Sequence, residues 1–401
     1  MNFYEKYART VLISGVAFKE GQCLQIAAEP VHAELVSTIE AEAYKMGAKY
    51  VEINLQHPRN SVNRSLHQKE EFLDYYPAYL KNRVEEFVNE KWSFISLSGM
   101  EDPYVTKKID QKRNAISVKA NRMITKPMSL AMGDGRCSWC VVAAATDGWA
   151  RQLGLKDKVE LWNILTPILR LDHESPELAW KNHSETLAKR NKILNDMNID
   201  FLHFEGEGTD LKIYMNEHSV FKGGAMLGDG ESPEIPNLPT EEVFTTPNYR
   251  LTEGKVKVTR PVQVLGDQVE NAWFVFKKGE VVEYGASYGK NLLDEYFKID
   301  PKAKYLGEVA LVDGSSPIFK SGRVFNNILL DENASCHIAL GNGISFAMNI
   351  TGKTEDELDE LGCNKSLLHT DFMIGSESIN VTATTKNGDK RPVIRNGLFV
   401  L

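Results

Sequence analysis

Two histidines of this chain lie among acidic residues, glycines and small residues in its second half. His337 follows Glu332 by five positions in LDENASCHIALGNG, and His369 precedes Asp371 by two positions in LLHTDFMIG. Residues two apart on a strand point to the same face, so His369 and Asp371 can offer an imidazole nitrogen and a carboxylate oxygen to one cation. Such a mixed ligand set suits zinc, cobalt or manganese. Taken alone, however, a His-X-Asp pair is more often a hydrogen-bonded surface pair.

Three further carboxylates lie in unusual settings. Glu308 is the charged residue of the apolar run YLGEVALV, and a carboxylate buried in a strand is costly unless it is paired or binds a metal. Glu241 and Glu242 follow each other in PNLPTEEVFTTP, between prolines and just before a β-branched and aromatic run. One of these two acids can be a polar residue at the edge of a strand, but this structural explanation does not account for both.

The cysteines suggest two other kinds of site, and both are weaker. A redox or zinc site at Cys137-Ser-Trp-Cys140 would need a helix after the motif or a second cysteine pair, but the residues that follow are strand-like. Cys336 adjoins His337, yet neighbours on a strand point to opposite faces, so we expect Cys336 to pack in the core.

The first half of the chain alternates strand-like and helix-like segments. Gln22–Ala28, Lys49–Leu55, Trp92–Leu97 and Cys140–Ala145 read as strands, and Val31–Met46 has helical spacing. Strands that alternate with helices indicate a parallel sheet covered by helices. We therefore predict an α/β domain with a largely parallel sheet over residues 1–195, closed by the charged helical stretch Pro176–Asn195.

The second half has a different pattern: short runs in which apolar and polar residues alternate, separated by glycine, asparagine and proline. The clearest strand-like runs are Leu211–Met215, Lys255–Thr259, Trp273–Lys277 and Glu280–Tyr284, and Lys278-Gly279 fits a hairpin turn. Residues 196–401 are therefore predicted to form a strand-rich domain that carries the metal site. The fold class of the whole chain is α/β followed by α+β.

Composition limits the function. The 401 residues carry a net charge of -8 without a basic cluster, which argues against a nucleic-acid partner. An odd number of cysteines, five, favours a reducing compartment and free thiols. The start of the chain does not read as a signal peptide, and no apolar stretch reaches the ~18 residues of a membrane helix, so we expect a soluble cytoplasmic protein.

Several long segments together resemble the thermophilic aminopeptidase family, the metalloaminopeptidases of the aminopeptidase T and PepS type. They are GEGTDLKI, NLPTEEVFTTP, LGEVALVDGSSPI, LLDENASCHIALGNG and HTDFMIG, in family order, with GQCLQIAAEP and AYKMGAKYVEI in the first half. The resemblance implies release of N-terminal amino acids from peptides through a water activated by two divalent metal ions, and a homodimer. It also implies the ligand set Glu242, Glu308, Glu332, His337, His369 and Asp371.

Within that set, the resemblance places Glu308 between the two ions, and we take Glu308 as the candidate catalytic carboxylate, with Glu241 as an alternative. The family usually has a tyrosine where this chain has Ile344, and isoleucine cannot donate a hydrogen bond. This difference keeps two alternatives open: a non-enzymatic or weakly active metal-binding relative, or another metallohydrolase such as an amidase.

Overall fold

The computed structural model describes residues 2–228, 232–350 and 352–401 and divides the chain into two compact units. The first unit consists of Met1–Asn182 and Ala225–Pro239, and the second of His183–Gly224 and Thr240–Leu401. The predicted domain boundary between residues 195 and 196 falls near the end of the helix α8 (Pro176–Asp196) and stays a prediction. No helix in the described ranges is long and apolar enough to cross a bilayer.

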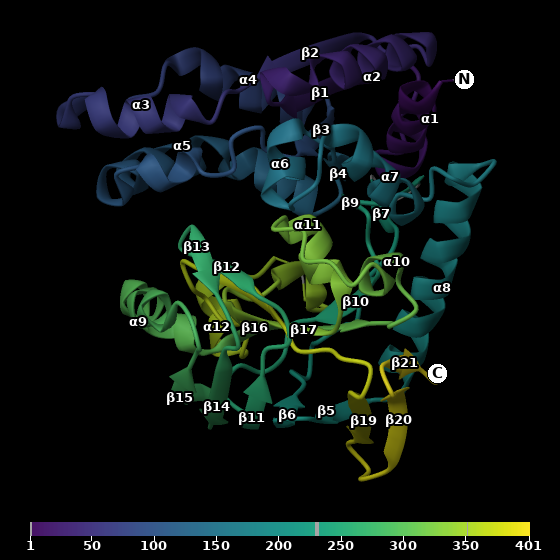
Figure 1. Ribbon diagram of the computed structural model, residues 1–401, viewed down its shortest axis with the longest axis vertical. Coiled ribbons are helices and arrows are strands. Elements are labelled where there is room, and N and C mark those ends of the chain that lie inside the picture. Colours follow the sequence, from purple (N-terminus) through teal and green to yellow (C-terminus); the bar gives the residue numbers. More distant parts are fainter. Residues whose placement is uncertain (1, 229–231, 351) are drawn as a thin grey trace. The chain divides into compact units, whose positions relative to one another are not determined.

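The first unit contains a parallel sheet with strand order β2-β1-β3-β4-β9 and helices between its strands (Figure 1). Its strands are β1 (Cys23–Ala28), β2 (Tyr50–Leu55), β3 (Ser93–Ser98), β4 (Trp139–Ala143) and β9 (Asn237–Leu238), with the small pair β7 (Met226–Gly228) and β8 (Ser232–Glu234). Its helices are α1 (Phe3–Thr10), α2 (Ala33–Lys45), α3 (Arg59–His67), α4 (Ala78–Asn89), α5 (Gln111–Gly133), α6 (Asp147–Gln152), α7 (Lys158–Ile168) and the start of α8. It also has the π-helix η1 (Val11–Gly15) and the short 3-10 helices η2 (Pro30–His32), η3 (Glu70–Phe72) and η4 (Val105–Lys108).

Local sequence explains why these elements form. Helix α2 buries Leu35, Ile39 and Ala43, which recur at helical spacing and therefore lie on one side of the helix. Strand β3 alternates buried and partly buried residues, as expected for a strand with one face in the core. The predicted α/β organisation is confirmed. The long helix α5, which begins at the capping residue Asp110, was not anticipated.

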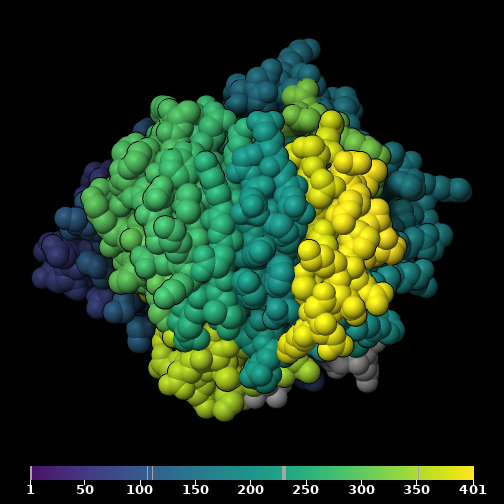
Figure 2. Space-filling model, turned by 90° about the horizontal axis from the view of Figure 1, so that it is seen from below, coloured from purple at the N-terminus to yellow at the C-terminus, as the bar shows by residue number. Residues whose placement is uncertain are grey.

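The second unit contains two antiparallel sheets, of eight and four strands. The larger has the order β15-β14-β11-β6-β5-β19-β20-β21, and Figure 2 shows the segments of this sheet side by side on one face. Its strands are β5 (Ile199–Gly206), β6 (Thr209–Tyr214), β11 (Glu253–Lys257), β14 (Trp273–Lys277), β15 (Glu280–Gly285), β19 (Asn380–Thr385), β20 (Lys390–Arg395) and β21 (Leu398–Phe399).

The smaller sheet has the order β10-β16-β17-β18. Its strands are β10 (Glu242–Thr245), β16 (Leu306–Val312), β17 (His337–Gly341) and β18 (His369–Met373). The unit also contains the pair β12 (Val262–Val264) and β13 (Asp267–Val269), the helices α9 (Lys290–Ile299), α10 (Pro317–Lys320), α11 (Ile328–Asp331) and α12 (Glu355–Glu360), and the turns η5 (Pro301–Lys304), η6 (Glu332–Ala334) and η7 (Ser345–Ala347).

An apolar core lies between the two sheets of the second unit. Val309 and Ile338 of the smaller sheet are fully buried in it, and Phe372 packs edge-on against Phe274 of the larger sheet, with ring centroids 5.0 Å apart. The predicted strand-rich fold of this half is confirmed, as is the hairpin turn at Lys278-Gly279, where both residues have positive φ. The core fixes which face of the smaller sheet is left for polar side chains.

Candidate metal centre

The smaller sheet turns its second face away from this core, and the predicted ligands come from that face. In the strand register, Glu308 lies opposite Ala339, and Ala339 lies opposite Asp371, so the three side chains share a face. His337 lies opposite Ala310, two residues from Glu308, and therefore belongs to the same face. Strand alternation explains why these polar groups meet although their neighbours in the sequence are core residues.

The side chains meet in two groups, and Glu308 belongs to both. In the first group, His337 Nε2 lies 3.3 Å from Glu242 Oε2 and 3.8 Å from Glu308 Oε1. In the second, His369 Nε2 lies 3.3 Å from Glu308 Oε2 and 3.4 Å from Asp371 Oδ1. Within each group the potential ligand atoms lie within 4.8 Å of one another. The two oxygens of one carboxylate thus face two different sets of ligands.

Glu332 lies in η6, outside both groups, but its carboxyl group is coupled to them. Burial raises its pKa well above the usual value, and the nearby charges of Glu242 and Asp371 raise it further. Asn333 Nδ2 donates a hydrogen bond of 3.4 Å to Glu332 Oε1. The structure therefore places all six predicted residues in one region of the second unit, five of them in the two groups and Glu332 beside them.

The protonation of the cluster reflects the crowding of acids. Burial raises the pKa of Glu242, with repulsion from Glu308 and Asp371 adding to it against the attraction of His337. At Glu308 burial acts in the same direction, but hydrogen bonds from His337 and His369 outweigh it and lower the pKa. Burial lowers the pKa values of His337 and His369. The surrounding carboxylates have the opposite and larger effect, so both pKa values are raised. Without a cation, the cluster has to share protons among its members.

Two atoms of the cluster test whether these residues fit a metal ion. Glu242 Oε2 and Asp371 Oδ1 are buried, and although an imidazole Nε2 lies 3.3 Å from the first and 3.4 Å from the second, neither oxygen has a well-aligned hydrogen bond in the described part of the chain. A buried carboxylate oxygen without a donor is costly, and a bound cation removes that cost. Carboxylates with two imidazoles are also a donor set that zinc and similar divalent ions accept. The residues therefore fit a metal centre.

Backbone carbonyls orient both imidazoles, and no sequence pattern signals them. His337 Nδ1 lies 3.2 Å from the carbonyl of Ser335, and His369 Nδ1 lies 2.8 Å from the carbonyl of Asn342. A hydrogen bond at Nδ1 leaves Nε2 free to face the carboxylates, an arrangement typical of histidines that bind metal. These positioning contacts depend on loops whose conformation the sequence alone does not reveal.

Glu241 and Ile344 occupy different surroundings. The carboxylate of Glu241 lies 3.4 Å from His183 Nε2 and belongs to neither group among the described residues. The backbone of Ile344 is held by Thr246, whose hydroxyl accepts from the Ile344 amide at 2.8 Å and donates to its carbonyl at 3.0 Å. Ile344 thus has a fixed backbone.

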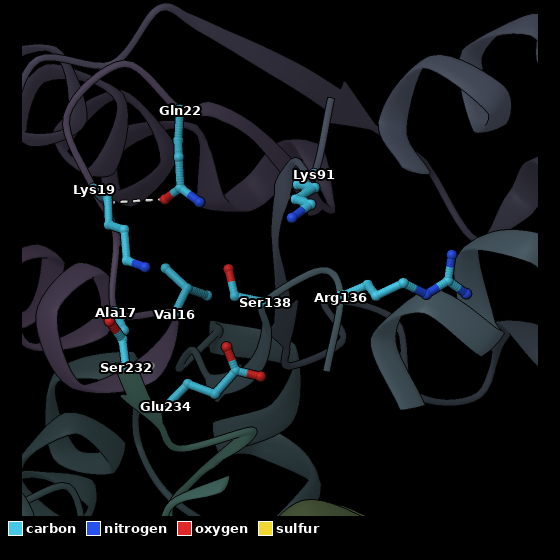
Figure 3. Close-up of a pocket in the computed structure, with 9 residues that line it drawn as sticks. All are labelled: Val16, Ala17, Lys19, Gln22, Lys91, Arg136, Ser138, Ser232 and Glu234. Carbon is cyan, nitrogen blue, oxygen red and sulfur yellow. Dashed lines mark hydrogen bonds between the residues drawn. The ribbon is translucent and has the colours of Figure 1, made fainter. Parts of the chain in front are cut away.

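The thiols lie in the protein interior. All five cysteines are free and buried, and Cys336 packs in the core of the second unit as expected. Figure 3 shows a separate pocket of the first unit, lined among others by Lys19, Lys91 and Glu234, whereas the guanidinium of Arg136 points away from it. Its volume of about 30 Å³ suits water molecules rather than a peptide.

Known proteins resemble the chain over its whole length. The family model described as thermophilic metalloprotease (M29) matches residues 2–399. The chain is 34% identical to aminopeptidase PepS of Streptococcus thermophilus over 99% of this chain and 98% of that protein. It is 33% identical to aminopeptidase T of Thermus aquaticus over 99% of this chain and 98% of that protein.

A solved structure agrees with these relatives. Wild-type AmpT from Thermus thermophilus matches with a TM-score of 0.91 and 32% identity over 100% of this chain and 99% of that one. The resemblance inferred from the sequence motifs is confirmed, and so is the predicted class of enzyme. The chain therefore belongs to the thermophilic metalloprotease (M29) family and is a metalloaminopeptidase.

Proposed function

We propose that the chain holds two divalent metal ions, zinc, cobalt or manganese, and uses them to release N-terminal amino acids from peptides. The proposed ligands are Glu242, Glu308, Glu332, His337, His369 and Asp371. The main support for this proposal is that Glu308 belongs to both groups of ligand atoms, with one carboxylate oxygen facing each group. A carboxylate in that position suits two ions better than one.

The ions, when bound, would polarise the scissile carbonyl and lower the pKa of a water molecule from 15.7 towards about 7. The residues of the chain supply the rest. Glu308 is the proposed catalytic carboxylate, which accepts the proton of the attacking water and passes it to the leaving amine. In the metal-free chain, hydrogen bonds from His337 and His369 lower the pKa of Glu308, so its carboxylate is ionised before any ion binds. The acidic surroundings favour a substrate whose free α-amine is positively charged.

The setting of this reaction is also part of the proposal. We infer a cytoplasmic homodimer that acts on peptides with a free N-terminus. The family resemblance supports the dimer, and the five buried thiols support a reducing compartment. Sedimentation equilibrium of the purified protein tests the dimer, because a monomer at micromolar concentration would contradict it.

Elemental analysis combined with an activity assay tests the two-metal site. Metal-stripped protein reloaded with zinc, cobalt or manganese is expected to bind two ions per chain and to hydrolyse amino-acid amides, but not their N-blocked forms. Glu308→Gln and His369→Ala are expected to bind fewer ions and to lose at least about a hundredfold in activity, because metal ligands matter more than the residues that orient them.

A matched control for these variants is Glu207→Gln. Glu207 is an exposed acid in the turn between β5 and β6 that pairs with Lys257 at 3.0 Å, so its substitution should change neither the ion content nor the activity. Metal-dependent activity that survives in both Glu308→Gln and His369→Ala would reject the proposed ligand set.

A further inference from the structure

Lys222 lies on the face of the smaller sheet that carries the metal centre. Its backbone pairs with Phe244 of β10, with N–O distances of 2.9 and 2.8 Å in the two directions. Directly paired residues of antiparallel strands share a face, so the side chains of Lys222 and Phe244 lie on the same side. Phe244 is two residues from Glu242 on a regular strand and shares its face.

An aromatic pair accompanies the lysine. The ring of Phe244 packs edge-on against Phe346 of η7, with centroids 6.0 Å apart and planes at 88°. The ammonium of Lys222 lies 5.6 Å from the centroid of the Phe346 ring. All three side chains are partly exposed. Together they form an apolar surface with one positive charge, on the sheet face that carries the metal centre.

The charge of Lys222 has no acidic partner in the part of the chain that the structure describes. Among the residues that the structure describes, no carboxylate lies within 4.0 Å of its ammonium. Burial alone lowers the pKa of this lysine, and no nearby acid counteracts it. Lys302, another partly buried lysine of the same unit, forms an ion pair with Asp359. The difference leaves the ammonium of Lys222 available to an anionic ligand, as far as the described residues are concerned.

The spacing of the strands shows how long a ligand must be to reach from the metal centre to Lys222. Ala310 lies between Phe244 and His337 in the register, so the first group of ligands meets beside it. Two strand spacings, about 10 Å, separate Ala310 from Lys222. A fully extended dipeptide spans about 7 Å, and the flexible four-carbon stem of lysine covers the remaining distance.

We propose that Lys222 binds the terminal carboxylate of a short peptide substrate, while Phe244 and Phe346 pack against the apolar part of its second residue. The inference rests on the proposed function, because it assumes that the scissile bond lies at the metal centre. It makes Lys222 a residue that determines specificity: the enzyme prefers dipeptides with a free carboxylate to their amides.

The test compares leucyl-leucine with leucyl-leucine amide, which differ in the terminal charge. Wild-type enzyme is expected to show a lower KM for the free acid. Lys222→Met should raise the KM for the free acid about tenfold and leave that for the amide unchanged, because one charge-assisted contact is lost. Lys222→Arg should keep the preference, since arginine retains the positive charge.

Lys212→Met is a matched control. Lys212 lies 5.7 Å from the ring centroid of Phe201 on the larger sheet, so the substitution removes a similar lysine and aromatic contact from another sheet. It should leave the ratio of the two KM values unchanged. Thermal unfolding followed by circular dichroism establishes that each variant is folded before its kinetics are compared.

Two outcomes separate this inference from the proposed function. If wild-type enzyme hydrolyses leucyl-leucine amide and Lys222→Met leaves the ratio of KM values unchanged, the role of Lys222 is rejected and the proposed function stands. If the wild type hydrolyses neither compound, the proposed function fails. Titration calorimetry with the intact dipeptide then tests Lys222 by itself, and equal affinities for acid and amide would overturn its role.

Discussion

Burial changes the protonation of ionisable side chains outside the metal centre too, and His32 in the first unit is an example. His32 is 5% exposed, and burial is the main cause that lowers the pKa of its imidazole from 6.5 to about 4. The folded chain therefore keeps His32 neutral at a pH where the unfolded chain binds a proton. A site of this kind makes stability depend on pH.

The first unit should accordingly lose stability as the pH falls from 6.5 towards 4. Protons bind the unfolded state more strongly in that window, and the loss should reach about 3 kcal/mol at its lower end. Urea unfolding at pH 7 and pH 5 measures the effect. His32→Leu should reduce the pH dependence, whereas substitution of the exposed His67 by glutamine should not; equal pH dependence in all three proteins would contradict the assignment.

The two adjacent acids Glu241 and Glu242 illustrate how much a single residue's sequence context reveals. Both lie in the segment between Pro239 and Pro247, where Glu242 begins β10, and the family resemblance is what favoured Glu242. In the structure, Glu242 contacts His337, whereas Glu241 contacts His183. Neighbours on a strand point to opposite sides, and only the core packing of Val243 determines which side each acid faces.

Strand β16 contains an irregularity that shapes the second group of ligands. The register with β17 shifts between Leu306 and Glu308, and Gly307 lies at the shift. A Cβ atom on Gly307 would lie 2.0 Å from the carbonyl oxygen of Asn342, so only glycine allows this approach. The same carbonyl contacts His369 Nδ1, which links the shape of the strand to the orientation of a proposed ligand.

Gly307→Ala should therefore damage the second group of ligands more than the first. Displacement of Asn342 is expected to cost about 1–3 kcal/mol in stability and to release His369, so that the metal content falls from two ions towards one. Gly133→Ala is the control, because a Cβ there has open space. Denaturant unfolding and elemental analysis measure both effects. An unchanged metal content in Gly307→Ala would contradict this link.

The chain as a whole has two units, and the proposed ligands all belong to the second. Its apolar core extends over both antiparallel sheets, and the first unit has separate buried clusters, such as that of Phe87 and Trp92. A ligand that binds only the folded state stabilises the unit to which it binds. Metal binding should therefore act unequally on the two parts of the chain.

Removal of metal with a chelator should lower the melting temperature of the second unit and affect the first much less. A free metal concentration 100 times Kd would stabilise the bound unit by about 2.7 kcal/mol. Calorimetry with and without chelator, combined with hydrogen exchange to assign each transition, measures this difference. Equal loss of protection in both units would show that they unfold together and would contradict the prediction.

The sequence by itself determined the class of each half of the chain. Periodicity distinguished the helices and parallel strands of the first half from the short strands of the second, because burial of one face imposes a spacing of 3.6 or 2 residues. It also pointed to six candidate ligands and, through motifs in a fixed order, to the family. Segments with weaker periodicity were missed, including α5 and strand β5.

Only the tertiary structure decided which side chains meet. Glu242, Glu308, His337 and His369 lie on four different strands, and their distances depend on the register of those strands and on the core beneath them. No pattern in the sequence around Lys222 indicates a role in binding. Its significance arises from a pairing with Phe244 and a contact with Phe346, and such long-range contacts leave no local pattern in the sequence.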